Sequence, residues 1–265
     1  MRLCSIASGS SGNCIYVGSD TTHLLVDVGI SGRKTEEGLH ELGLSGEDIH
    51  GILVTHEHSD HIGGIGVMAR KRGIPIYATA GTIEAMKRAN TLGKAEDSLF
   101  HEIRADESFY IGDIMVDATK ISHDAAEPVA YRFRYENRRV AVCTDLGTFD
   151  DYIVEKMRGM DAILIESNHD VRMLQVGSYP YYLKKRILGD RGHLSNENSG
   201  RLLSRLLHDN MKQIILGHLS RENNLPELAY ETVRIEIENG DNPYHADDFP
   251  IQVARRSEVS PVITV

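Results

Sequence analysis

The 265-residue sequence predicts a mixed α/β (α+β) fold with a functional site at the ends of its strands. Short apolar runs, typical of buried strands, alternate with helical patterns through the first half of the chain, and further strands follow. Five strands end in a histidine or an acidic residue, and the loop Thr55–His61 alone holds three histidines and one aspartate. Because loops on a rigid scaffold often carry function, we expect these residues to gather at one rim.

The first half is predicted to begin with a strand meander and to continue with alternating helices and strands. The strands of the meander are expected over residues 2–8, 13–19 and 22–28, which alternate apolar and polar residues between turns. A helix over 32–43, a strand over 51–55, a helix over 63–72, a strand over 75–78 and a helix over 81–90 should follow. No linker, low-complexity segment or fixed-period repeat interrupts the chain, so we expect one domain over residues 1–265.

The second half is predicted to deliver further chemically active residues at strand ends. Strands are expected over 113–122, 129–135, 139–144, 162–166, 213–216 and 251–256. Helices are expected over 180–189 and after Ser195 and Asn224, each of which should cap its helix. His123, Asp145 and His218 each follow one of these strands.

Composition excludes several classes of protein. The net charge is −10 and the pI about 5.7, so a polyanionic substrate would need a local basic groove or metal ions. The three cysteines are odd in number and far apart, which argues against a disulfide framework or a structural zinc site. The first residues resemble no signal peptide and no run reaches membrane-spanning length, so a cytoplasmic protein without membrane contact is expected.

The motif His-x-His-x-Asp-His at positions 56–61 has the spacing of a metal site. Alternate side chains of an extended segment point the same way, so His56 and His58 can face one ion. Asp60 and His61 follow the turn and can reach a second ion. Imidazole nitrogen and carboxylate oxygen are ligands for borderline divalent metals. The alternative, a polar loop in which histidines cluster by chance, is much less favoured by this spacing.

This motif after an apolar strand resembles the metallo-β-lactamase superfamily of binuclear metallohydrolases. The resemblance covers residues 1 to about 220 and implies a four-layered αββα sandwich with the metals at one edge. It also implies a ligand set: His56, His58 and His123 for one ion, Asp60, His61 and His218 for the other, and Asp145 bridging both.

Three segments resemble, more narrowly, the bacterial WalJ (YycJ) group, which is linked to DNA exonuclease activity. They are Ser-Gly-Ser-Ser-Gly-Asn near the N-terminus, Glu-Ser-Asn-His-Asp from residue 166 and Arg-Gly-His-Leu-Ser-Asn from residue 191. In a related phosphodiesterase branch, a histidine shortly before the last ligand donates a proton, and His193 matches it. Only about twenty residues separate His123 from Asp145, which leaves no room for the substrate-gripping arm of tRNA-processing relatives.

The resemblance implies a metal-dependent phosphodiesterase, most simply an exonuclease on DNA in preference to RNA. Two divalent ions, Zn²⁺ or Mn²⁺ with iron as a further option, would share a hydroxide that attacks the phosphodiester. Asp60 would orient that hydroxide and His193 would protonate the leaving oxygen. Di-iron oxidoreductases of this fold carry a carboxylate at the position of His58, so the resemblance implies hydrolysis in preference to redox chemistry. Two other classes stay open: a hydrolase of a small thioester, lactone or cyclic phosphate, and a non-catalytic regulatory partner.

Substrate contacts are expected from two segments, each with a structural alternative. Ser10, Ser11 and Asn13 lie in a small-residue loop that could present backbone N–H groups to a phosphate or form only a tight turn. Lys184 and Arg186 lie near His193 and could meet flanking phosphates or belong to a solvated helix face. Asp27, at the end of the third strand, could orient a ligating histidine or have a loop-capping role.

Overall fold

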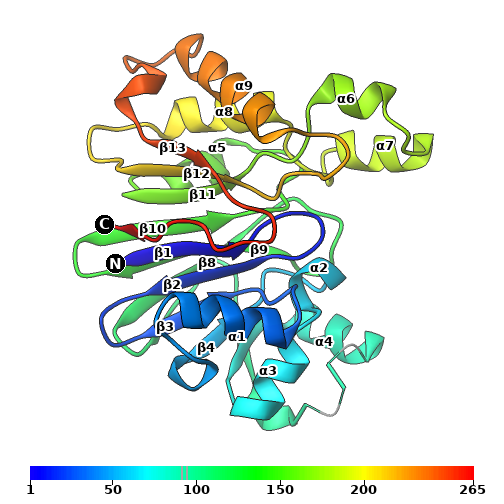
Figure 1. The fold of residues 1–265 in the computed structure, drawn as a ribbon, viewed down its shortest axis with the longest axis vertical. Coiled ribbons are helices and arrows are strands. Elements are labelled where there is room, and N and C mark those ends of the chain that lie inside the picture. Colours follow the sequence, from blue (N-terminus) through cyan, green and yellow to red (C-terminus); the bar gives the residue numbers. More distant parts are fainter. Residues whose placement is uncertain (91, 94) are drawn as a thin grey trace.

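The computed structural model describes residues 1–90, 92–93 and 95–265, and within them two seven-stranded sheets pack face to face (Figure 1). The first sheet has the order β14 (Ile263–Thr264), β1 (Arg2–Ala7), β2 (Cys14–Gly18), β3 (His23–Val26), β4 (Gly51–Leu53), β5 (Ile76–Thr79) and β6 (Phe100–Ile103). The second has the order β13 (Ile251–Val253), β12 (Gln213–Gly217), β11 (Ala162–Glu166), β10 (Arg138–Cys143), β9 (Val129–Tyr135), β8 (Ile114–Lys120) and β7 (Ser108–Ile111).

Helices cover the outer face of each sheet. On the first sheet lie α1 (Gly32–Glu41), the short α2 (Ser59–Ile62), α3 (Ile65–Arg72) and α4 (Ala80–Ala89). On the second lie α5 (Asp151–Met157), α8 (Asn196–Leu206) and α9 (Pro226–Glu238), while α6 (Val171–Val176) and α7 (Tyr181–Leu188) stand out beside it (Figure 1). The predicted four-layered αββα arrangement is confirmed. No helix in the described ranges combines the length and apolar character that crossing a bilayer requires.

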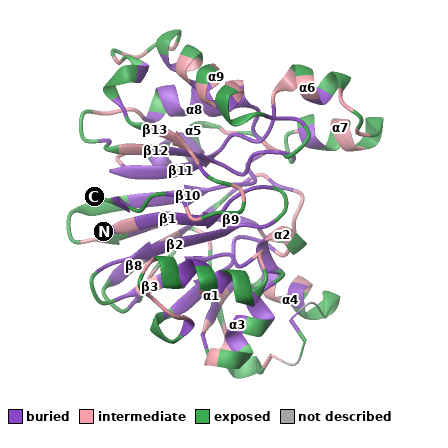
Figure 2. Cartoon of the chain, viewed as in Figure 1, coloured by how far each residue is buried: buried purple, intermediate pink, exposed green. Residues whose placement is uncertain are grey.

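Side-chain alternation explains why the central strands read as unbroken apolar runs. In β3, Leu24 and Val26 enter the core between the two sheets, whereas Leu25 packs under the helices of the first sheet. In β11, Leu164 faces the other sheet and Ile163 faces the helices. Both faces of these central strands are therefore buried, and Figure 2 colours most of their residues as buried; each fully buried aliphatic side chain contributes about 1.5–3 kcal/mol.

Most predicted elements are present with shifts of one to three residues at their ends, and two predictions need correction. The segment expected to be only a loop holds the short helix α2, which ends at Ile62, and the helix expected over 63–72 begins after Gly63 and Gly64, as α3. A Cβ atom at Gly64 would lie 2.1 Å from the carbonyl oxygen of Ile30, so the chain packs too closely there for a side chain. Asn224 does not cap α9: Leu225 holds that position, and the Asn224 amide donates to the Ser167 and Asn168 carbonyls.

Candidate metal centre

The seven predicted ligands come together at one edge of the interface between the sheets. They occupy loops or helix starts that follow strands of both sheets: β4 leads to the 56–61 motif, and β8, β10 and β12 lead to the three later residues. The side chains fall into overlapping groups whose ligand atoms lie within 4.8 Å of one another. The members of these groups drawn from the predicted set are His56, His58, Asp60, His61, His123, Asp145 and His218.

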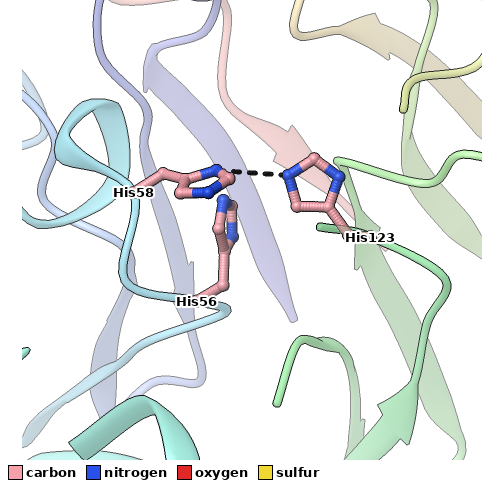
Figure 3. A group of neighbouring side chains, drawn as sticks. All are labelled: His56, His58 and His123. Carbon is pink, nitrogen blue, oxygen red and sulfur yellow. Dashed lines mark hydrogen bonds between the residues drawn. The ribbon is translucent and has the colours of Figure 1, made fainter. Parts of the chain in front are cut away.

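The first group consists of three imidazoles, which converge from two loops (Figure 3). His58 Nδ1 and His123 Nε2 lie 3.2 Å apart. His123 Nδ1 lies 3.0 Å from the Gly192 carbonyl, to which it can only donate, so its Nε2 carries the free lone pair. Thr55 Oγ1 lies 3.0 Å from His56 Nδ1, which leaves Nε2 of His56 facing the group.

The second group combines two imidazoles with carboxylates. Asp60 Oδ2 lies 3.6 Å from His61 Nε2 and 3.4 Å from His218 Nε2. The side-chain amide nitrogen of Asn13 lies 3.1 Å from His61 Nε2. This group joins the two halves of the fold. His218 follows β12 of the second sheet, whereas Asp60 and His61 lie in α2, which covers the first sheet.

Asp145 lies between the two groups. Its Oδ2 is 3.1 Å from His61 Nε2, and its Oδ1 is 3.3 Å from His218 Nδ1 and 3.8 Å from His123 Nε2. The residue follows β10 with a φ of 57°, in the left-handed region that non-glycine residues rarely adopt. This backbone conformation turns the carboxylate toward both groups.

Unpaired buried atoms show that these residues fit metal ions. Among the described residues, His56 Nε2, Asp145 Oδ2 and His218 Nε2 are buried and have no hydrogen-bond partner. Leaving such an atom unsatisfied costs about 1–3 kcal/mol, so native proteins seldom bury several together. Imidazole nitrogens and a carboxylate oxygen aimed at shared positions are donors for a divalent cation.

Asp27 holds two residues of the motif loop, His61 and Thr55. Its Oδ2 lies 2.7 Å from His61 Nδ1, which fixes that ring with Nε2 toward the second group. Its Oδ1 accepts from the Thr55 backbone N–H at 2.8 Å, and Thr55 Oγ1 donates to Oδ2 at 2.8 Å. Both roles considered for Asp27 are therefore present, since it holds the histidine and also fixes the start of the motif loop.

Glu166 is a central residue to which the sequence assigned no role. This fully buried carboxylate ends β11; its Oε1 lies 2.7 Å from His193 Nδ1 and 3.0 Å from His218 Nδ1. Its Oε2 accepts the backbone N–H groups of Leu146 and Leu194. The available signal was its place at a strand end, the place that also holds the ligand Asp145.

Comparison with known proteins decides the family. The profile described as "Beta-lactamase superfamily domain" matches residues 22–218. The chain belongs to the β-lactamase superfamily. Within the superfamily, the exodeoxyribonuclease WalJ of Streptococcus pneumoniae is 44% identical over 236 residues, 89% of this chain and 88% of that protein. The exodeoxyribonuclease YycJ of Bacillus anthracis is 44% identical over 88% of each chain. The predicted resemblance to this group is confirmed.

A solved structure of the superfamily fold agrees along the full length. Zn²⁺-bound PqqB from Methylobacterium extorquens superposes with a TM-score of 0.73 at 15% identity and covers 100% of both chains. At this identity the match concerns the fold alone. It supports the two-sheet architecture on which the β-lactamase superfamily site is built.

The electrostatics of the superfamily site differ between the two groups. Burial lowers the pKa of His56 well below its usual value and also lowers the pKa of His123. Burial would lower the pKa of His218 too, but Asp145, Asp60 and Glu166 outweigh it and raise that pKa to about 10. The pKa of Glu166 falls to about 2: burial opposes this, and His193 and His218 cause it.

Only some of the residues expected from sequence to contact the substrate line the pocket at the site. A pocket of about 340 Å³ at the superfamily site is lined by Ser10, His58, Ser59, Asp60, Asp145, Asn168, Tyr179, Leu183, Arg186, Ile187, His193, His218 and Ser220. Ser10 and Arg186 thus line it, whereas Ser11 lines a separate cavity. Asn13 is buried against His61, and the Lys184 ammonium donates to the Gln175 and Gly177 carbonyls.

Proposed function

We propose that this β-lactamase superfamily protein is a metal-dependent exonuclease that hydrolyses DNA. The observation that carries the proposal is the convergence of the seven predicted ligands, with buried unpaired donor atoms aimed at shared positions. The identity of 44% to two exodeoxyribonucleases over nearly nine-tenths of each chain supports DNA as the substrate.

We infer two divalent ions, one at each group of ligands. His56, His58 and His123 would hold the first, and Asp60, His61 and His218 the second, with Asp145 contacting both. When bound, such ions polarise the phosphodiester and lower the pKa of water to about 7, so that a nucleophile exists at neutral pH. The donor set suits Zn²⁺ or Mn²⁺, and iron is also compatible with it.

The protein's own groups would orient the reactants and move the proton. Asp60 lines the pocket and can accept a hydrogen bond from the attacking water. His193 also lines the pocket; because its Nδ1 is held by Glu166, its Nε2 is available to donate a proton to the leaving oxygen. Glu166 stabilises the protonated imidazole and fixes its orientation, as a positioning residue.

The experiment uses DNA strands labelled at either end, single-stranded and duplex, with Zn²⁺, Mn²⁺ or Fe²⁺ added to chelator-stripped protein. We expect mononucleotide release that chelation abolishes and that His58→Ala reduces at least about 100-fold, since losing even an outer partner of a metal ligand costs about 10–100-fold. His40→Ala, an exposed histidine on α1, is the matched control and should retain wild-type activity.

Two results would contradict the proposal. Wild-type activity in His58→Ala would show that the metal centre does not carry the reaction. Hydrolysis of a thioester, lactone or cyclic phosphate without DNA cleavage would favour the small-substrate alternative, and no activity with any metal would favour a non-catalytic partner.

We also propose a reducing, cytoplasmic location. Cys4, Cys14 and Cys143 are all buried free thiols in the structure. Burial raises the pKa of each, to about 12 for Cys4, so these thiols are poor nucleophiles for disulfide exchange. Detection of the native protein in a fractionated cell lysate tests this location.

A further inference from the structure

Helix α7 forms one wall of the catalytic pocket and projects from the body of the molecule. Leu183, Arg186 and Ile187 of this helix line the pocket at the metal centre, and Tyr179 precedes it. In Figure 1, α6 and α7 stand clear of the layer formed by α8 and α9, and much of α7 is exposed in Figure 2. The helix therefore presents one side to the pocket and another to solvent.

A second concavity of about 430 Å³ adjoins the pocket along the same helix. It is lined by residues of α7 and of the position just after it, which share one helical face: Tyr182, Lys185, Arg186 and Gly189. Arg186 lines both spaces, so the concavity continues from the pocket at the metal centre. We call this concavity the α7 groove; its full lining is Asp124, Tyr182, Lys185, Arg186, Gly189, Asp190 and Arg191.

The charges of the α7 groove are arranged to favour an anion. Asp124 is paired with Arg186, whose Nη2 donates to Oδ1 at 3.0 Å, so its negative charge is matched. Arg191 donates to the His123 carbonyl from Nε and Nη2, at 3.2 and 3.1 Å, which fixes its guanidinium and leaves its charge unmatched there. Lys185 is exposed and Asp190 is the remaining carboxylate. Because Asp124 and Arg186 neutralise each other, Lys185 and Arg191 against Asp190 leave one excess positive charge in the groove, which favours the phosphates of a nucleic acid.

Tyr182 adds a surface for a planar ligand. Tyr182 is 74% exposed and lies on the same face as Lys185 and Arg186. An exposed aromatic ring beside phosphate-binding cations is the combination that binds single-stranded nucleic acid, because unpaired bases offer a face for stacking. In a duplex those faces are covered by neighbouring base pairs.

We propose that the α7 groove binds the single-stranded segment of DNA next to the end being hydrolysed. An unpaired base stacks on Tyr182, the flanking phosphates meet Lys185 and Arg191, and the adjoining nucleotide reaches the pocket past Arg186. The proposal rests on the proposed exonuclease function and extends it. The DNA segment that occupies the groove is unpaired, whether the substrate is single-stranded DNA or a duplex with an unpaired end.

The test measures binding separately from catalysis. Fluorescence anisotropy of a labelled twelve-nucleotide oligo-dT is followed in chelator, so that no cleavage occurs, with the full-length protein. Tyr182→Ala should weaken binding about tenfold, because stacking on one aromatic ring changes affinity by about that factor. Tyr182→Phe, which keeps the ring, should bind within about twofold of wild type. Tyr110→Ala, at an exposed tyrosine on β7, is the matched control.

A charge variant tests the other half of the groove. Lys185→Ala should reduce the slope of log affinity against log salt by about 0.7, the value for one phosphate contact on a single strand. Lys71→Ala, at an exposed lysine on α3, should leave the slope unchanged. Blunt duplex DNA should respond less to Tyr182→Ala than the oligo-dT does.

The outcomes separate this inference from the proposed function. If wild type degrades DNA but Tyr182→Ala and Lys185→Ala bind oligo-dT as tightly as wild type, the groove assignment is wrong and the exonuclease proposal stands. If wild type binds oligo-dT through these residues but degrades no DNA, the exonuclease proposal fails instead. Equal weakening of duplex and oligo-dT by Tyr182→Ala, or a dimeric wild type made monomeric by it, would also overturn the groove assignment.

Discussion

The two groups of ligating side chains differ in charge and in what holds them. The first, His56, His58 and His123, contains only imidazoles, and burial lowers the pKa of two of them. The second contains carboxylates; although burial opposes it, Asp145 and Asp27 raise the pKa of His61 well above its usual value. His56 and His123 of the first group therefore favour the neutral form that binds a metal, whereas the second group is held together by its own charges when no ion is present.

This difference shows that histidines in neighbouring groups have different roles in the structure. The imidazoles of the first group contribute to structure mainly through the ion they would hold. Those of the second group also neutralise the buried carboxylates Asp27, Asp145 and Glu166, so their removal affects folding as well as metal binding.

Asp145 is the residue where the two groups meet, and its loss should have the largest effect. Asp145→Asn keeps the shape but removes the charge that both groups contact, so DNA hydrolysis should fall by about 1,000-fold or more, with loss of bound metal. Metal content by elemental analysis and initial rates on labelled DNA measure this. Asp151→Asn, on the exposed N-terminus of α5, is the control, and retention of both ions by Asp145→Asn would contradict its place between the groups.

Two histidines of one motif separate the roles of the groups. His61→Ala leaves Asp27 and Asp145 buried without their imidazole partner and should destabilise the metal-free protein by about 3–5 kcal/mol. His58 is 29% exposed; within the described part of the chain its Nδ1 meets His123 and its Nε2 lies 3.9 Å from Asp124, so His58→Ala should cost about 1 kcal/mol or less. Urea unfolding in chelator measures both. Equal costs would remove the distinction drawn between the groups.

Asp27 should matter for the second ion more than for the first. Asp27→Asn weakens the hydrogen bond that orients His61, and such outer partners contribute about 10–100-fold to metal affinity. Competition titration with a chromophoric chelator should show one weakened site and one nearly unchanged site. Uniform weakening of both sites would mean that Asp27 supports the whole loop, through Thr55, more than it supports one ligand.

The smallest effect expected is a pH dependence of the metal-free protein. The folded pKa of His218 is about 10, above its usual 6.5, so its contribution to stability is complete below pH 6.5 and is lost as the pH rises toward 10. Glu166, at about 2 against a usual 4.5, contributes above pH 4.5 and loses its contribution as the pH falls toward 2. The melting temperature in chelator should therefore fall by a few degrees between pH 6.5 and 9.5, and less with bound metal.

The convergence of the seven candidate ligands and the four layers could be predicted because their signals are local. Each later candidate ligand lies within three residues of the end of a strand, such as Gln213–Gly217 before His218, and the 56–61 motif is compact in sequence. The strands that precede His56, Asp145 and His218 end at one edge of the molecule. Identifying the residues that follow each predicted strand was therefore sufficient to predict that these side chains lie close together.

The remaining features depend on contacts between distant segments. Nothing near Glu166 indicates that its carboxylate meets His193 and His218, which lie 27 and 52 residues away. Asn13 was expected at the substrate, but its amide reaches back to His61. The edge strands β6 and β7 were not predicted, because their exposed sides mix polar and aromatic residues. Asn224 has the side chain of a helix cap, but buried carbonyl partners compete for it.

Three residues of the centre have left-handed backbones: Asp27, Asp145 and His218, with φ of 58°, 57° and 55°. Any β-carbon is disfavoured in that conformation, by roughly 1 kcal/mol or more. Alanine scanning would keep this steric penalty at all three positions while deleting the functional atoms. Glycine would delete the same atoms and relieve the penalty, so comparing the two replacements at each position separates the conformational cost of building the centre from the chemistry that it carries.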